Sequence, residues 1–231
     1  YYRRKSVENF ICHFPNHSPV SSDEFLFSKK IIQNQQEADC IPLTSQQHVN
    51  YFIHEMFLSE ASRSSGKISL LLQPEHSFVF HLLSTLAPSD TLEVQHILCL
   101  NSKDTFTDQH ELVNLKYLHE IFPIYISGLN YTLWYYYDDI HSHYHNMNVF
   151  PCMILTSEAA LMCTSDGQYG IFYQNTDVIH MLQELYNTYL EECSPLFLKT
   201  VFSPDNFSNV FSTVFEVDVT EPTFALQPEV C

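Results

Sequence analysis

Residues 150–197 of this chain, FPCMILTSEAALMCTSDGQYGIFYQNTDVIHMLQELYNTYLEECSPLF, hold the pattern that decides its fold. Three short apolar runs, at 150–156, 159–165 and 169–174, are separated by turns of polar residues and glycine. Apolar runs of this length between such turns are typical of paired β-strands. The stretch therefore predicts one edge of a β-sheet.

A long amphipathic helix is predicted directly after these strands. Asn175, Thr176 and Asp177 can cap its first turn, and Pro195 ends it. Its apolar stripe, in which we expect Met181 to fill the core, consists of Val178, Met181, Leu182, Leu185, Tyr186 and Tyr189. The sheet edge and the layer that covers it are thus consecutive in sequence.

Upstream of this stretch, the apolar pattern alternates between strand and helix. Strands are predicted at 67–73, 92–100 and 131–137, and helices at 78–86, which Pro88 ends, and 112–122, which Pro123 stops. Such alternation favours parallel strands joined by crossover helices. The predicted fold class is α/β or α+β, with a central mixed sheet covered by helices and an N-terminal helical segment.

The clearest N-terminal helix covers 44–64, where Thr44 and Gln47 have the spacing of a capping box. We expect three parts: an N-terminal helical segment over 1–66, an α/β sensing domain over 67–203, and a C-terminal strand or hairpin segment over 204–231. The chain starts at Tyr1 rather than Met and its Pro-containing tail shows no terminal element. We therefore expect a fragment of a longer protein.

The chain is strongly acidic, with 27 Asp and Glu against 10 Lys and Arg in 231 residues and a formal charge of −17. No Lys or Arg lies between Lys116 and Lys199. Nucleic acids and anionic membranes both select clustered cations, so we expect neither as a partner of this region. A phosphate-bearing ligand there would depend on backbone amides or a metal.

Seven cysteines are scattered along the chain, mostly in apolar runs, and no Cys-x-x-Cys pair occurs. This pattern is typical of reduced, buried thiols in a cytoplasmic protein. Cys163 is interpreted as such a thiol rather than as a nucleophile, because no cation nearby in sequence would lower its pKa.

Residues 131–137, YTLWYYY, place aromatic side chains on both faces of one predicted strand. A plain sheet core is the interpretation we favour, because large aromatic side chains fill cores first. The alternative is the wall of a ligand pocket, for which the candidates are Tyr131, Trp134, Tyr135, Tyr137 and Tyr169.

A histidine cluster follows this strand. His141, His143 and His145 come after Asp138 and Asp139 in DDIHSHYH. Residues two apart in a strand share a face, so the three imidazoles and a water could hold zinc, with an aspartate orienting one of them. The alternative is a polar loop whose histidines are solvated. No other cofactor is indicated.

The order of predicted elements, with the segment HNMNVFPCMILTSEAALMCTSDGQYGIFY and its following helix, resembles one half of a phospholipase D-like domain. The signature of that family is His-x-Lys followed by Asp before a strand pair. Here His145 would occupy the His position, but Met147 stands at the Lys position and Cys152 at the Asp position. Starting at His143 instead places His145 and Phe150 there. The phosphate-gripping lysine is absent, which argues against phosphodiester hydrolysis.

Degenerate domains of this sort resemble the effector-sensing parts of some bacterial transcriptional regulators, which follow an N-terminal helix-turn-helix. The resemblance implies a regulatory domain that binds a small-molecule effector or a protein partner, with a homodimer as one arrangement and the DNA-binding part absent from this fragment. Two alternatives stay open. One is a metal-dependent hydrolase that uses the histidine cluster, and the other is a pure dimerisation or interaction module, which predicts an exposed apolar patch and no pocket.

Overall fold

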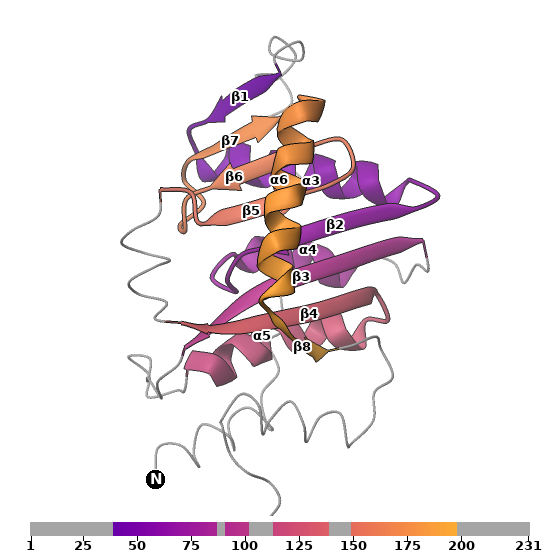
Figure 1. The fold of residues 1–231 in the computed structure, drawn as a ribbon, viewed down its shortest axis with the longest axis vertical. Helices are drawn as coiled ribbons and strands as arrows, with labels where there is room; N and C mark the ends of the chain where they lie inside the picture. Colours follow the sequence, from indigo (N-terminus) through magenta and orange to yellow (C-terminus); the bar gives the residue numbers. More distant parts are fainter. Residues whose placement is uncertain (1–38, 87–90, 102–112, 139–148, 198–231) are drawn as a thin grey trace, which may run out of the picture.

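The computed structural model describes residues 39–86, 91–101, 113–138 and 149–197, which form one mixed eight-stranded sheet with helices on both faces (Figure 1). The strands lie in the order β1-β7-β6-β5-β2-β3-β4-β8. Their bounds are Cys40–Leu43 for β1, Gly66–Leu71 for β2, Leu92–Asn101 for β3, Asn130–Asp138 for β4, Cys152–Leu155 for β5, Ala160–Cys163 for β6, Gly170–Tyr173 for β7 and Ser194–Phe197 for β8. The predicted mixed sheet covered by helices is confirmed.

Four helices cover the sheet within the described ranges: α3 Gln46–Ala61, α4 Ser77–Thr85, α5 Val113–Ile126 and α6 Thr176–Glu191. In Figure 1, α6 crosses one face, and the other three helices lie on the opposite face. Each face has its own hydrophobic cluster. The larger contains Phe57, Phe80 and Ile121, and the smaller contains Leu182 and Tyr186. The burial of apolar side chains on both faces holds the three layers together.

Strand direction changes at β2, which pairs with β3 in parallel and with β5 antiparallel. β3 and β4 are also parallel, whereas β5, β6, β7 and β1 pair antiparallel in turn. As a result, the carboxyl ends of β2, β3, β4 and β6 and the amino end of β5 share one edge of the sheet, here called the carboxyl edge. This is the edge at which open α/β sheets usually bind ligands.

α3 begins one residue later than the predicted capping box requires. Its N-cap is Ser45, whose hydroxyl accepts a hydrogen bond from the backbone N–H of His48 at 3.3 Å. The assignment of the cap to Thr44 and Gln47 is therefore wrong. The extended backbone of Ser45 brings its hydroxyl to the third amide after it, which leaves Thr44 outside the helix.

α5 continues through Pro123 to Ile126, so the prediction that Pro123 stops this helix is wrong. An interior proline removes its own N–H from the helix ladder and crowds the carbonyl four residues earlier, which usually kinks or ends a helix. Ile124 and Tyr125, which follow it, are buried in the core, and their burial favours the last turn. α6, by contrast, ends at Glu191, before Pro195, which lies in β8.

The predicted cap of α6 is confirmed, because the Asn175 side chain accepts from the backbone N–H groups of Asp177 and Val178. Its buried side consists of Ile179, Leu182 and Tyr186. The prediction that Met181 fills the core is wrong, because Met181 is 56% exposed. The sheet covers one side of the helix only, and the predicted stripe is wider than that side.

The predicted segments over 1–66 and 67–203 contribute strands to the same sheet. β1 from the first segment pairs with β7 from the second, and α3 packs against the larger cluster. The division at residue 66 stays a prediction, and the segment over 204–231 lies outside the described residues. Among the helices that the structure describes, none is both long and apolar enough to cross a bilayer.

Candidate functional site

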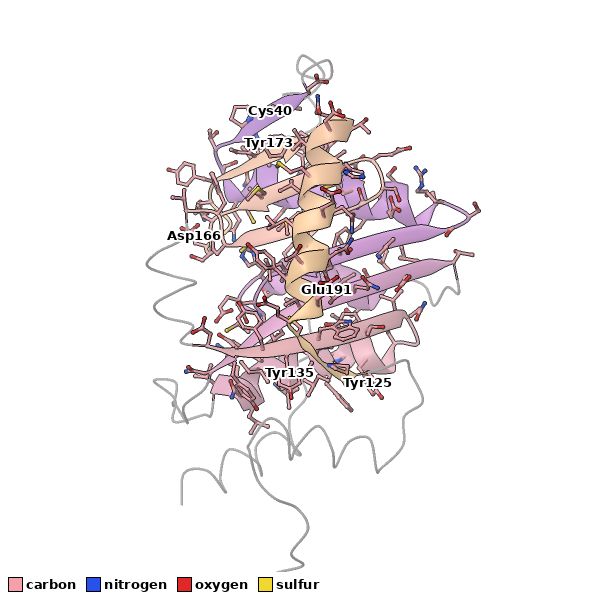
Figure 2. The ribbon with its side chains drawn as sticks, viewed as in Figure 1. Cys40, Tyr125, Tyr135, Asp166, Tyr173 and Glu191 are labelled. Carbon is pink, nitrogen blue, oxygen red and sulfur yellow. The ribbon has the colours of Figure 1, made fainter. Side chains whose placement is uncertain are left out.

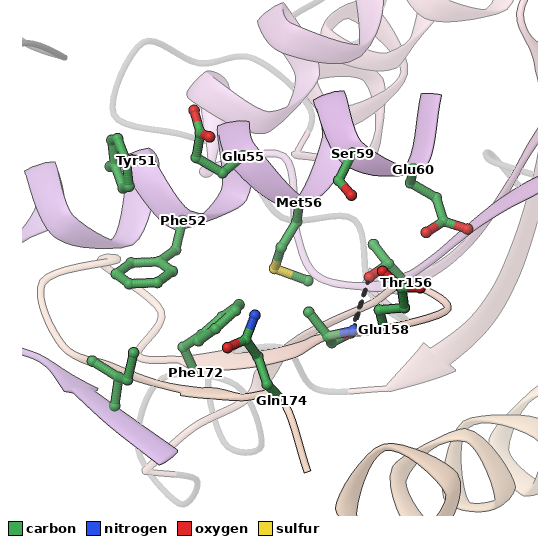
Figure 3. Close-up of a pocket in the computed structure, with 12 residues that line it drawn as sticks. Tyr51, Phe52, Glu55, Met56, Ser59, Glu60, Thr156, Glu158, Phe172 and Gln174 are labelled. Atoms are coloured by element: carbon green, nitrogen blue, oxygen red, sulfur yellow. Dashed lines mark hydrogen bonds between the residues drawn. The ribbon is translucent and has the colours of Figure 1, made fainter. Parts of the chain in front are cut away.

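A pocket of about 240 Å³ opens between α3 and the antiparallel half of the sheet (Figure 3). α3 forms one wall, and β1, β7 and the turn between β5 and β6 form the other. The residues that line it are Ile41, Tyr51, Phe52, Glu55, Met56, Ser59, Glu60, Thr156, Glu158, Ala159, Phe172 and Gln174.

Apolar side chains form the inner surface of this pocket. The rings of Phe52 and Phe172 lie 4.5 Å apart between centroids, and Met56 is buried beside them. Figure 3 shows these three side chains directed toward the same space. The exposed residues Ser59 and Gln174 bring polar groups to its rim. A small molecule with an apolar body fits this combination.

The charged groups of the pocket are all carboxylates, from Glu55, Glu60 and Glu158, and no Lys or Arg lines it. The Glu158 carboxylate pairs with Arg63 outside the lining, at 2.7 Å. Burial and the Glu55 carboxylate both raise the pKa of Tyr51, so its phenol stays protonated. The electrostatic field at the pocket therefore favours neutral or cationic ligands over anions.

Glu60 is 2% exposed and has a structural role. Its Oε1 accepts from the backbone N–H of Lys67 at 2.8 Å and from the Ser157 hydroxyl at 2.5 Å, and its Oε2 accepts from the Ser157 backbone N–H at 3.2 Å. A buried carboxylate requires such donors. Glu60 thereby ties the end of α3 to the start of β2 and to the turn between β5 and β6.

The aromatic residues predicted as ligand candidates do not line this pocket. Tyr131 is fully buried in the larger hydrophobic cluster, and Tyr135 and Tyr137 pack against that cluster. Trp134 packs against the smaller cluster on the α6 face, and Tyr169 is 57% exposed in the turn between β6 and β7. The five residues thus lie in three separate places, and ligand binding by any of them stays a prediction.

The Tyr131 hydroxyl belongs to a buried polar link across the parallel strands. The ring of His96 is fully buried, with Nε2 2.9 Å from the Leu72 carbonyl oxygen and Nδ1 2.5 Å from the Tyr131 hydroxyl. A carbonyl oxygen can only accept, so Nε2 carries the proton and Nδ1 accepts from Tyr131. Burial lowers the pKa of His96 to about 4, although the hydrogen bond to the Leu72 carbonyl raises it in part. The ring is therefore neutral at pH 7.

At the carboxyl edge, His76, Cys152 and Cys163 come together. Cys152 opens β5 and Cys163 closes β6, where the two are paired across the strands and buried. His76 lies between β2 and α4, with its Nε2 3.0 Å from the Cys152 sulfur. That sulfur also lies 3.6 Å from the carbonyl oxygen of Thr164. Burial raises the pKa of the Cys152 thiol well above its usual value, and the interpretation of Cys163 as a buried thiol is confirmed.

No local signal in the sequence indicates this cluster, because 76 positions separate His76 from Cys152. Only the parallel-to-antiparallel pairing around β2 brings them together. The predicted metal ligands, His141, His143 and His145, lie within 139–148, outside the described residues. Cys152, which stands at the Asp position of the phospholipase D-like signature, is described and lies at the carboxyl edge.

No protein-family model matches this chain, and no curated protein sequence matches it. Among solved structures, TrmBL2, an archaeal chromatin protein with a novel mode of DNA binding, is 11% identical with a TM-score of 0.43, over 75% of this chain and 65% of that one. Polyphosphate kinase from Porphyromonas gingivalis is 16% identical with a TM-score of 0.42, over 76% and 29% of the two chains. NucT from Helicobacter pylori is 15% identical with a TM-score of 0.42, over 68% and 96%.

This chain therefore matches less than two thirds of the length of TrmBL2 and of polyphosphate kinase. At these identities and TM-scores, the likeness is one of fold at most, and no function follows from it.

Proposed function

We propose that this chain is the regulatory domain of a transcriptional regulator and binds a small effector in the pocket beside α3. The observation that carries the proposal is the pocket itself, with apolar walls, carboxylates as the charged groups of its lining and no lysine or arginine there. The effector is a neutral or cationic molecule with an apolar body. The resemblance to degenerate phospholipase D-like sensing domains supports the regulatory role, with DNA contacted by a part outside this chain.

The lining also supports binding rather than turnover. No histidine or cysteine is among the twelve residues of the pocket. Hydroxyl and thiol nucleophiles usually depend on a neighbouring imidazole, and the hydroxyls of Ser59 and Thr156 have none in this lining. Thr156 instead exchanges hydrogen bonds with Ala159, as the dashed line in Figure 3 marks.

Isothermal titration calorimetry against a panel of small neutral and amine-bearing molecules tests this proposal. Ser59→Trp and Leu58→Trp form a matched pair, because both residues are exposed on α3 but only Ser59 lines the pocket. Ser59→Trp is expected to weaken binding at least tenfold, and Leu58→Trp to leave it unchanged. Equal affinities of the two variants, or no binding by the wild-type chain to any member of the panel, would contradict the proposal.

A second candidate function is that of an interaction module, which the exposed side of α6 favours. Met181, Leu185 and Tyr189 are 56%, 40% and 43% exposed and lie four residues apart on one side of the helix. The helical repeat places Asp177, Glu184 and Glu192 on the same side. This apolar and acidic surface suits a partner with apolar and basic side chains rather than a second acidic copy.

Binding of a basic amphipathic helical peptide, measured by fluorescence anisotropy, tests this second candidate. Leu185→Lys is expected to weaken binding more than tenfold, with Leu58→Lys on α3 as the exposed apolar control. An unchanged anisotropy with the wild-type chain would exclude a basic partner. A dimer in light scattering that Leu185→Lys dissociates would instead assign the surface to self-association.

A further inference from the structure

We propose that His76, Cys152 and Cys163 form a binding site for a thiophilic metal ion, with Zn²⁺ as the expected metal. One imidazole nitrogen and two sulfurs meet at the carboxyl edge, and the three ligand atoms all lie within 4.8 Å of one another. This inference is independent of the proposed function, because none of the three residues lines the pocket beside α3.

The distances between these atoms fit a metal after small adjustments. Tetrahedral zinc takes sulfur at about 2.3 Å and nitrogen at about 2.0–2.1 Å, which places neighbouring ligand atoms roughly 3.5–3.8 Å apart. His76 Nε2 lies 3.0 Å from the Cys152 sulfur, somewhat closer than a metal requires. Side-chain rotations that move each ligand atom by about 1 Å would create the site, with no change in the strand pairing of Cys152 and Cys163.

The net charge of the loaded site favours Zn²⁺ over Cu⁺. On binding, each thiol gives its proton to solvent and a sulfur lone pair to the metal, while His76 binds as the neutral ring. Two thiolates and Zn²⁺ sum to zero charge, which suits a position where Cys152 and Cys163 are 0% and 1% exposed. Cu⁺, the other common thiophilic ion, would leave a net charge of −1 in the same place.

His76 has the freedom that a ligand needs. It occupies the N-cap position of α4, but its side chain makes no capping hydrogen bond and contacts Cys152 instead. The turn at Gly167, with φ of 67°, lies beside the ring, since a Cβ built there would make an ordinary contact with His76 Nδ1 at 3.6 Å. The glycine turn thus leaves the space beside it to the imidazole ring.

A carboxylate also belongs to this turn, because Asp166 directly precedes Gly167 in the chain. Asp166 interacts electrostatically with His76, and its position is fixed by hydrogen bonds from the Thr164 hydroxyl and the Gln168 backbone N–H. Asp166 is exposed, and Figure 2 shows it at the edge of the sheet. Three protein ligands leave the fourth position of a tetrahedral metal for water or a small ligand.

Titration of the reduced full chain with Zn²⁺, in competition with a chromophoric chelator and without oxygen, tests the site. One ion per chain is expected, and Co²⁺ in its place is expected to show tetrahedral bands with thiolate-to-metal charge transfer. His76→Gln and Cys163→Ala are expected to weaken Zn²⁺ binding at least tenfold. Cys193→Ser and His180→Gln, which change a thiol and an imidazole elsewhere in the described structure, are the matched controls.

His76 is only half-buried, so His76→Gln keeps the assay valid if the buried Cys163→Ala variant fails to fold. The combined substitution of His141, His143 and His145 by Gln separates this site from the histidine cluster of the sequence. Loss of binding in that combined variant but not in His76→Gln would overturn the proposal. So would a Cys152–Cys163 disulfide that, once reduced, leaves a chain without metal affinity. Binding of Cu⁺ without Zn²⁺ would keep the thiophilic site and overturn its assignment to zinc.

Discussion

At the scale of single residues, two buried polar side chains decide how distant segments are joined. His96 links the strands β2, β3 and β4 through Leu72 and Tyr131, and Glu60 links α3 to β2 and to the turn between β5 and β6. Both are almost fully buried. Such groups stabilise a fold only while every hydrogen bond is made, so their substitution is costly.

His96 gives the protein a defined acid sensitivity. Its pKa falls from 6.5 in the unfolded chain to about 4 in the folded protein, because burial disfavours the charged ring. Above pH 6.5 both states are neutral and the contribution is complete. As pH falls toward 4, the unfolded state takes up the proton first, and about 3 kcal/mol of stability is lost.

Urea unfolding at pH 7.0 and pH 4.5 measures this loss. The free energy of unfolding is expected to fall between pH 7.0 and pH 4.5 in both chains. The fall is expected to be smaller in His96→Gln than in the wild-type chain, by about 2–3 kcal/mol. Carboxylates titrate in both proteins, so their contribution cancels. Equal pH dependence of the two chains would show that His96 is not buried as a neutral ring.

Glu60 and Glu158 provide a matched test of burial, because both line the same pocket. The Glu60 carboxylate accepts hydrogen bonds in the interior, whereas the Glu158 carboxylate forms an ion pair with Arg63. Glu60→Gln places an amide N–H₂ against donors and is expected to destabilise the fold by about 2 kcal/mol. Glu158→Gln breaks an ion pair on the surface and is expected to leave the urea midpoint almost unchanged. Similar midpoints for the two variants would contradict the structural role of Glu60.

At the scale of elements, α6 shows how one helix can have two apolar sides with different fates. Leu182 packs on the sheet and is 4% exposed, whereas Leu185, three residues later, is 40% exposed. The hydrophobic pattern is the same for both. The sheet beneath the helix decides which of them is buried, because only one side of α6 faces it.

Substitution of these two leucines by alanine separates the two sides. Leu182→Ala is expected to destabilise the fold by about 2–4 kcal/mol, because it removes buried methyl groups and leaves a cavity. Leu185→Ala is expected to change stability by less than about 0.5 kcal/mol. Urea unfolding of both variants measures the difference, and comparable losses would mean that a partner or another segment covers Leu185.

At the scale of the whole molecule, one sheet joins the described residues from β1 to β8. A shared sheet with a cluster on each face is expected to unfold cooperatively. Trp134, the only tryptophan, lies on the α6 face, so its fluorescence reports on that face, while far-UV circular dichroism reports on all elements. The two signals are expected to give the same urea midpoint. Separate midpoints would instead support independent units near the predicted boundary at residue 66.

The fold was more predictable than the candidate sites. Strand and helix positions follow local periodicity, which is why the strand at 131–137 was found within one residue at each end of β4. Pro123 was misjudged because its effect on α5 depends on the burial of Ile124 and Tyr125, which no local pattern shows. The aromatic residues of β4 were correctly placed on two faces, but the pocket lies elsewhere, beside α3.

The sequence by itself determined the mixed sheet, the cap of α6 at Asn175 and the acidic character of the chain, because these depend on neighbouring residues and on composition. The tertiary structure alone decided which side of α6 is buried, where the pocket opens and that His76 meets Cys152 and Cys163. Those features depend on strand order, and the reversal of direction at β2 joins residues far apart in the chain. Strand order is set by the packing of the whole core, and the pattern of one segment does not determine it.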